Sequence, residues 1–165
     1  MCIRDSFYGV NYELRRQGAF VKGNPAYLTN HRRPLVSILV RTFEGRSFLL
    51  EQAIATVFNQ SYPLIELIVS EDGGDTQKNI VETMAKQAPP GTTVQFIASP
   101  KSGRATAGNA ALGAASGDYF IFLDDDDLLY ADHVETLVQS LLENSSCCVA
   151  YSLGCLLYTS PSPRD

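Results

Sequence analysis

The sequence of 165 residues lacks the features that mark several large classes of protein. No apolar run approaches the roughly 20 residues that a membrane-spanning helix needs, and no basic segment followed by an apolar one opens the chain. Positive charge is scarce, because 13 Lys and Arg residues stand against 18 Asp and Glu residues, so we expect no nucleic-acid partner. We expect a cytoplasmic protein, with attachment to the inner face of the membrane left open for the full-length form.

The sequence also lacks a cysteine framework. Its four cysteines show no CxxC spacing, which argues against a zinc site or a set of disulfides: Cys2, Cys147, Cys148 and Cys155. The adjacent pair is poorly placed to bridge to itself. We expect reduced thiols, with Cys148 in the core.

The two ends differ in character from the middle of the chain. Residues 1–6 (MCIRDS) and the segment that closes with LLYTSPSPRD resemble translated sequencing-adapter read-through. We therefore expect residues 1–6 and 154–165 to be non-native and the natural protein to continue in both directions; an ordinary disordered tail is the alternative. Residues 7–34 show no sustained period and are expected to form a lead-in or linker, which leaves a domain at residues 35–153.

Strand and helix patterns alternate through this domain. Short apolar runs predict strands at residues 35–40, 65–70, 93–98, 119–123 and 147–153. Helical spacing predicts helices at residues 47–58, 75–87, 103–115 and 131–143, the second with Asp75 as its N-cap. This order predicts an α/β fold with a mostly parallel sheet flanked by helices, and a ligand site beyond the carboxyl ends of the strands.

Two common nucleotide-binding motifs are missing at those strand ends. The loop after the first strand contains no GxGxxG, which disfavours a nicotinamide enzyme. Gly103 and Gly108 have the first spacing of a P-loop, but Asn109 and Ala110 stand where Lys and Ser or Thr should follow. We interpret these glycines as parts of a tightly packed helix rather than as phosphate contacts.

An acidic turn is the strongest chemical feature. Asp124, Asp125, Asp126 and Asp127 follow directly on a predicted strand, where adjacent carboxylates repel one another. A divalent cation relieves that repulsion, and one or two carboxylates plus diphosphate oxygens complete a shell for Mg²⁺ or Mn²⁺. The alternative is an exposed turn that leads into a helix.

Residues 34–151 resemble the N-terminal half of the family 2 glycosyltransferases, which have the Rossmann-like GT-A fold. The resemblance is carried, in order, by VSILVRTFEGR, LLEQAIATVFNQSYPLIELIVSEDGGDT, GRATAGNAALGAASGDYFIFLDDDD and LLYADHVETL. It implies that the fold is truncated on its C-terminal side. Some departures are conservative or known kinds of variation, such as Arg41 in place of a common proline. The more serious departure is Gly108, which replaces the arginine of a frequent Ala-Arg-Asn motif.

The resemblance also implies roles for individual residues. Thr42 and Phe43 would line the nucleobase pocket and Asp72 would contact the base. Asp126 and Asp127 would hold Mn²⁺ or Mg²⁺, although the register of the DxD motif within four aspartates is ambiguous. Asp124 and Asp126 would serve the ribose, and Asn109 is a further expected nucleotide-binding residue. Arg104, one helical turn before the missing arginine, is a candidate to reach the site in its place, and the alternative for it is a solvated helix residue.

The implied reaction is an inverting transfer of a sugar from a nucleotide-diphosphate donor, foremost a UDP-sugar, to an unknown acceptor glycan, lipid or protein. The general base and the acceptor pocket are expected beyond about residue 153. Two alternatives remain open. One is a nucleotide-binding module without turnover, and the other is a sugar nucleotidyltransferase, for which the loop at residues 42–46 lacks the expected Gly-rich, basic character.

Overall fold

A computed structural model of the chain describes residues 33–144 and 146–152, in which strands and helices alternate. None of the helices in this part of the chain is long and apolar enough to cross a membrane. The elements are β1 (Val36–Thr42), α3 (Ser47–Phe58), β2 (Ile65–Asp72), α4 (Lys78–Ala85), β3 (Thr92–Ser99), α5 (Arg104–Ala114), β4 (Tyr119–Asp124) and α6 (His133–Glu143).

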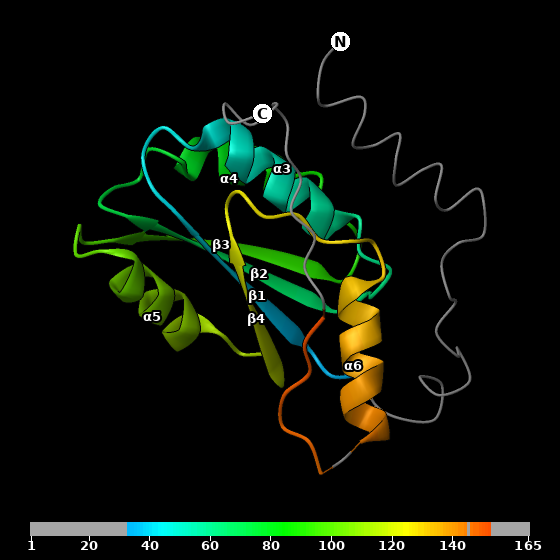
Figure 1. Ribbon diagram of the computed structural model, residues 1–165. Coiled ribbons are helices and arrows are strands. Elements are labelled where there is room, and N and C mark those ends of the chain that lie inside the picture. Colours follow the sequence, from blue (N-terminus) through cyan, green and yellow to red (C-terminus); the bar gives the residue numbers. More distant parts are fainter. Residues whose placement is uncertain (1–32, 145, 153–165) are drawn as a thin grey trace, which may run out of the picture.

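The four strands form one parallel sheet in the order β3-β2-β1-β4. Helix α5 covers one face, and α3, α4 and α6 cover the other (Figure 1). Arg41 is in register with Ser70 on β2 and with Asp124 on β4, so the carboxyl ends of the three strands meet at one edge. The predicted α/β fold with a parallel sheet and flanking helices is therefore confirmed.

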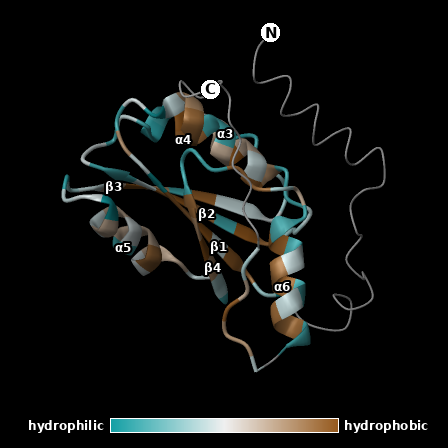
Figure 2. Ribbon diagram, viewed as in Figure 1, coloured by the Kyte–Doolittle hydropathy of each residue, from teal (hydrophilic) through white to brown (hydrophobic). Residues whose placement is uncertain are grey.

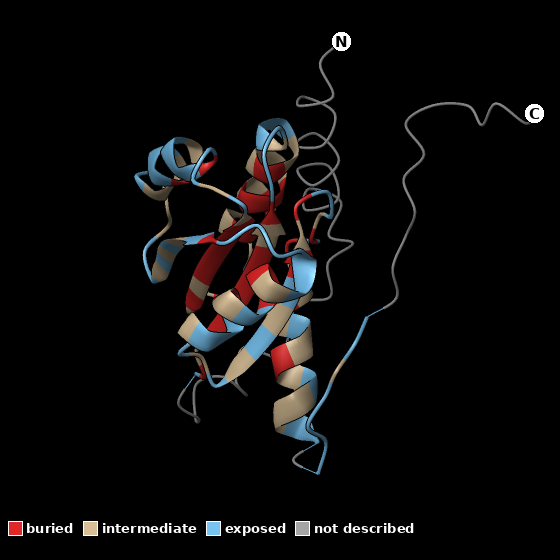
Figure 3. Ribbon diagram, turned by 90° about the vertical axis from the view of Figure 1, so that its left-hand side faces the viewer, coloured by how far each residue is buried: buried red, intermediate tan, exposed pale blue. Residues whose placement is uncertain are grey.

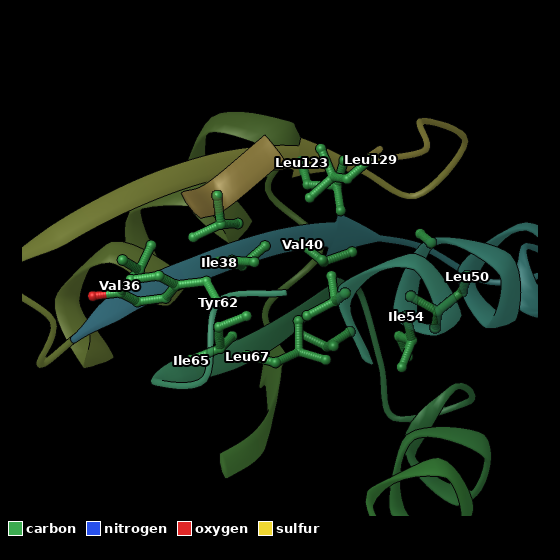
Figure 4. Close-up of a cluster of buried hydrophobic side chains, with 14 of the residues drawn as sticks. Val36, Ile38, Val40, Leu50, Ile54, Tyr62, Ile65, Leu67, Leu123 and Leu129 are labelled. Carbon is green, nitrogen blue, oxygen red and sulfur yellow. The ribbon is translucent and has the colours of Figure 1, made fainter. Parts of the chain in front are cut away.

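The larger core lies between the sheet and helices α3, α4 and α6. Because both faces of the central strands are covered, β1 and β2 are buried along almost their whole length. Figure 2 shows the apolar residues concentrated in the middle of the sheet, and Figure 4 shows how they interlock. The side chains that form the centre of this core include Val36, Ile38, Val40, Leu50, Ile54, Tyr62, Ile65, Leu67 and Leu123.

The core beneath α5 is much smaller. Its fully buried members are Leu39, Ile68 and Ala111, and α5 approaches the sheet through small residues. Figure 3 shows the buried positions running along the strands, while much of β4 stays uncovered. Phe120 and Phe122 on β4 are exposed and pack edge to face, with their ring centroids 5.6 Å apart. Because the buried residues of α5 are small, this helix lies close to the backbone of the sheet.

Glu66 on β2 ties the turn after α5 to the sheet. Its carboxylate accepts hydrogen bonds from the amide and hydroxyl of Ser116, at 2.8 and 2.7 Å, and from Ser37 Oγ at 2.6 Å. Burial by itself raises the pKa of Glu66, but these hydrogen bonds together outweigh it and lower the pKa below its ordinary value. The turn is thus held at the edge opposite the predicted ligand site.

Three sequence-based predictions about local structure are wrong. Asp75 does not cap a helix, because α4 begins at Lys78 and no side-chain cap bond forms there. In the described residues 147–152 there is no fifth strand, and residue 153 lies outside the described part of the chain. Cys148 is exposed rather than in the core, since this segment does not join the sheet. Cys2, Cys155 and the segments 1–6, 7–32 and 154–165 also lie outside the described residues.

Candidate functional site

The predicted site residues gather at the carboxyl ends of β1, β2 and β4. Thr42 ends β1, Asp72 ends β2 and Asp124 ends β4, and the acidic turn continues from Asp124 to Asp127. In a parallel sheet these ends lie side by side, which explains why residues more than 80 positions apart come together here.

Asp125 is the buried member of the acidic turn. Only 4% of the residue is exposed, and Thr42 Oγ1 donates a hydrogen bond to its carboxylate at 2.8 Å. Arg46 approaches the same carboxylate with Nη2 at 2.8 Å and Nε at 3.2 Å. A buried carboxylate needs such partners, so Asp125 joins the turn to β1 and to the start of α3.

Arg46 also connects two other predicted donor-site residues. Its Nη2 lies 2.7 Å from Asp126 Oδ2, and its guanidinium lies over the ring of Phe43, 5.2 Å from the centroid. The hydrogen bonds with Asp125 and then with Asp126 raise the pKa of Arg46 above its ordinary value. Asp126 and Phe43 remain half exposed, at 50% and 49%. Arg46 therefore orients both side chains and leaves one side of each open to a ligand.

Asp124 pairs with two other arginines, Arg41 and Arg104, on the side of the sheet that α5 covers. Its Oδ1 accepts a short hydrogen bond from Arg41 Nη2, and its Oδ2 lies 3.8 Å from Arg104 Nη2. Arg104 is largely exposed, so its interaction with Asp124 is weakened by solvent. The structure thus brings Arg104 to the site, as the sequence suggested, but gives the closer contact to Arg41.

Asp127 is the one member of the turn for which the described residues provide no arginine partner. Burial, followed by repulsion from the carboxylates of Asp126 and Asp124, raises the pKa of Asp127 above its ordinary value. Within residues 33–144 and 146–152 no three His, Cys, Asp or Glu side chains converge on a metal position. One or two carboxylates with phosphate oxygens suffice for Mg²⁺, so Asp127 and Asp126 fit a cation that a nucleotide diphosphate helps to hold.

The turn after β2 is organised by two acidic residues. Glu71 is buried, and its carboxylate accepts hydrogen bonds from the amide of Gln77, at 2.8 Å, and from the hydroxyl of Thr76. Asp72 Oδ1 accepts the amides of Ser102 and Gly103, at 2.9 and 3.0 Å, and so fixes the start of α5. Its other oxygen has no partner among the described residues. The base contact expected of Asp72 stays a prediction.

Sequence reasoning missed three residues that organise the site. It assigned no role to Arg41, Arg46 or Asp125, although charged residues at strand ends were a signal that such pairs could form. Spacing along the chain does not say which arginine meets which aspartate. Asn109, which was expected to bind the nucleotide, is an exposed residue of α5 whose side chain makes no hydrogen bond to the acidic turn within the described chain.

Comparison with known families decides where the chain belongs. Residues 37–155 match the model of "Glycosyl transferase family 2". The chain belongs to glycosyl transferase family 2. It is 37% identical over 112 residues to an uncharacterized glycosyltransferase of Haemophilus influenzae, and 34% identical over 113 residues to a β-1,3-glucosyltransferase of Campylobacter jejuni. Each match covers 67% of this chain.

A solved structure shows the same architecture. The mannosyltransferase of Pyrobaculum calidifontis, in complex with GDP-Man and Mn²⁺, matches 67% of this family 2 chain with a TM-score of 0.59 and 26% identity. This chain covers 33% of that protein, 44% of the Haemophilus protein and 35% of the Campylobacter protein. The chain thus spans less than half the length of these relatives.

Proposed function

We propose that this chain forms the donor-binding part of a glycosyltransferase that moves a sugar from a nucleotide diphosphate to an acceptor hydroxyl. The observation that carries the proposal is that the four carboxylates of the acidic turn have different partners. Arginines pair with Asp124, Asp125 and Asp126, while Asp127 faces its neighbours' negative charge with no arginine partner among the described residues. Family membership favours this function over a sugar nucleotidyltransferase or a binding module without turnover.

The nucleoside part of the donor is proposed to lie against β1 and the turn after β2. Phe43 offers an exposed aromatic face to a base, and the free oxygen of Asp72 can accept a base N–H. Thr42 contributes to this pocket indirectly, because its buried hydroxyl donates a hydrogen bond to Asp125. Asp126 and Asp124 are proposed to accept ribose hydroxyls, and the contacts of their carboxylates with Arg46 and Arg41 support this role.

The diphosphate is proposed to lie beside Asp127 and Asp126, which would hold Mn²⁺ or Mg²⁺. When bound, the cation stabilises the negative charge that develops on the departing nucleotide diphosphate. Arg104 at the start of α5 is exposed enough to turn toward a phosphate oxygen, and the amino end of this 11-residue helix also favours an anion. Asn109 is a further proposed contact, and it would reach the nucleotide if α5 and the ligand came closer together.

UDP-sugars and GDP-sugars are the two foremost candidates for the donor. The sequence resemblance favours a UDP-sugar, whereas the mannosyltransferase of similar fold was solved with GDP-Man. The acceptor is proposed to be a glycan, a lipid or a protein. The protein is proposed to act in the cytoplasm. We assign the general base to none of the described residues.

The deciding experiment is a calorimetric titration of the 165-residue chain with UDP, GDP and dTDP, each with and without Mn²⁺. We expect one nucleotide to bind in a metal-dependent manner. Asp127→Asn should weaken that binding roughly tenfold or more, because it removes a charged metal ligand.

Asp118→Asn is the matched control for this substitution. Asp118 lies at the other end of β4, where its carboxylate accepts the amide of Leu35 at 2.9 Å, and an asparagine oxygen can still accept that bond. Its binding should equal that of the unchanged chain. A folded chain that binds none of the nucleotides, or an Asp127→Asn variant that binds as well as the parent, would overturn the proposal.

A further inference from the structure

Arg41 and Gly108 share one space between β1 and α5. A Cβ placed on Gly108 would lie 3.2 Å from Cδ of Arg41 and 3.7 Å from the ring of Phe122. Gly108 is buried and lies on the side of α5 that faces the sheet. A longer side chain at position 108 would therefore compete with the stem of Arg41 for the same volume.

Arg41 extends through this space to form an ion pair with Asp124. The Arg41 guanidinium binds Asp124 and lies 5.8 Å from the centroid of the Phe122 ring, so two contacts hold it in place. Its Nε–H is buried and has no hydrogen-bond partner among the described residues, which leaves one charged donor unused. Arg104 approaches Asp124 less closely, at 3.8 Å, and from an exposed position.

We propose that Arg41 of β1 is the positioning residue for Asp124, and that Gly108 of α5 is the residue that makes room for it. A guanidinium on β1 can reach Asp124 because the buried position 108 of α5 carries no side chain. The inference rests on the proposed function in so far as Asp124 contacts the donor.

The pairing of Arg41 with Asp124 compensates negative charge in the acidic turn. Asp124 is followed by three further aspartates, of which Asp125 and Asp126 use Arg46. Without Arg41, Asp124 would keep only the exposed Arg104 and would be repelled by its neighbours. Its carboxylate would then turn toward solvent, and the donor would lose a pre-oriented contact.

The test compares four chains of 165 residues: the parent, Arg41→Gln, Gly108→Arg and the double variant. Affinity for UDP and GDP with Mn²⁺ is measured by calorimetry, and the thermal midpoint by circular dichroism. Arg41→Gln should weaken binding of the preferred nucleotide roughly tenfold, as expected for a lost charged hydrogen bond. Gly108→Arg should weaken binding and also lower the midpoint, because it crowds Arg41.

The double variant carries the decisive expectation. An arginine at position 108 finds the space that the shorter glutamine leaves, so the double variant should bind the nucleotide more tightly than either single variant and recover most of the lost midpoint. A general loss of packing would not be repaired by a second substitution. Gly113→Arg is the control, since a Cβ at this exposed position of the same helix meets nothing within 4 Å. It should match the parent in nucleotide affinity and should not lower the midpoint, since arginine has a higher helix propensity than glycine.

Two results would overturn the inference. One is an Arg41→Gln variant that binds nucleotide as well as the parent, and the other is a double variant whose losses are the sum of the two single losses. If the parent chain is folded but binds no nucleotide, the proposed function fails. The thermal midpoints then test separately whether Arg41 and position 108 share one space, because additive shifts contradict it and a recovered midpoint in the double variant supports it.

Discussion

Single residues in the turn after β4 differ sharply in environment, although Asp125 and Asp127 are only two positions apart. Asp125 is buried and holds Thr42 and Arg46, whereas Asp127 is exposed, lacks an arginine in the described chain and is repelled by its neighbours. The same type of side chain therefore stabilises the fold at Asp125, while at Asp127, two residues away, it is available for the ligand role that we propose.

This contrast predicts opposite effects of one substitution type. Asp125→Asn should lower the free energy of unfolding by about 2 kcal/mol, because Arg46 loses its buried charged partner. Asp127→Asn should raise it by a few tenths of a kcal/mol, because solvent screens the repulsion that it removes. Urea denaturation without metal or nucleotide measures both. Shifts in the same direction would contradict the assignment of these two roles.

Close approach of the backbone sets the requirements of α5 and β4 at the scale of elements. The turn between them passes so near β1 that a Cβ at Gly117 would lie 2.6 Å from Ser37 Oγ and 2.7 Å from Ser37 N. Gly117 N also donates to Ser37 Oγ at 2.9 Å. Gly113, one turn earlier on α5, has open space around it. Only the first of these two glycines is required by packing.

Alanine substitutions at the two glycines should therefore differ in sign. Gly117→Ala should destabilise the chain by about 1–3 kcal/mol, because backbone atoms of β1 cannot easily move away. Gly113→Ala should stabilise it by roughly 0.5 kcal/mol through helix propensity. Thermal unfolding followed by circular dichroism distinguishes the two, and a neutral Gly117→Ala would show that the turn can shift away from β1.

An imbalance between the two faces of the sheet dominates at the scale of the whole molecule. Helices α3, α4 and α6 pack on the large apolar cluster, while α5 packs through alanine and glycine over Leu39 and Ile68 (Figure 1). Less apolar area is buried beneath α5, so its local unfolding costs less free energy. The helix that carries Arg104 and faces Asp124 is thus the less firmly held one.

Hydrogen exchange provides the corresponding measurement. In the chain without ligand, we expect the amides of α5 to exchange faster than those of α3, because α5 opens without disrupting the large core. Binding of nucleotide and Mn²⁺ should slow exchange in α5 more than in α3. Equal protection of the two helices in the free chain would show that the small core is sufficient to make α5 part of the global unfolding unit.

Local pattern was enough to predict most elements of the fold. The helix at residues 47–58 was predicted with its observed ends, and strands β1 to β4 were each found within two residues of their predicted limits. These segments have clear periodicity and lie between turns, so their structure follows from short-range preferences. The predicted strand at 147–153 failed because an apolar run forms a strand only where a neighbouring strand can pair with it.

The alternating α/β order, the place of the acidic turn at a strand end and the family resemblance could all be predicted from the sequence, since all three depend on residues close together in the chain. The folded structure was needed to show that Arg41 pairs with Asp124, that Arg46 pairs with Asp125 and Asp126, and that Asp127 has no arginine partner among the described residues. These pairs join residues about 80 positions apart. They depend on strand register and on which face each side chain takes, quantities that exist only once the sheet has formed.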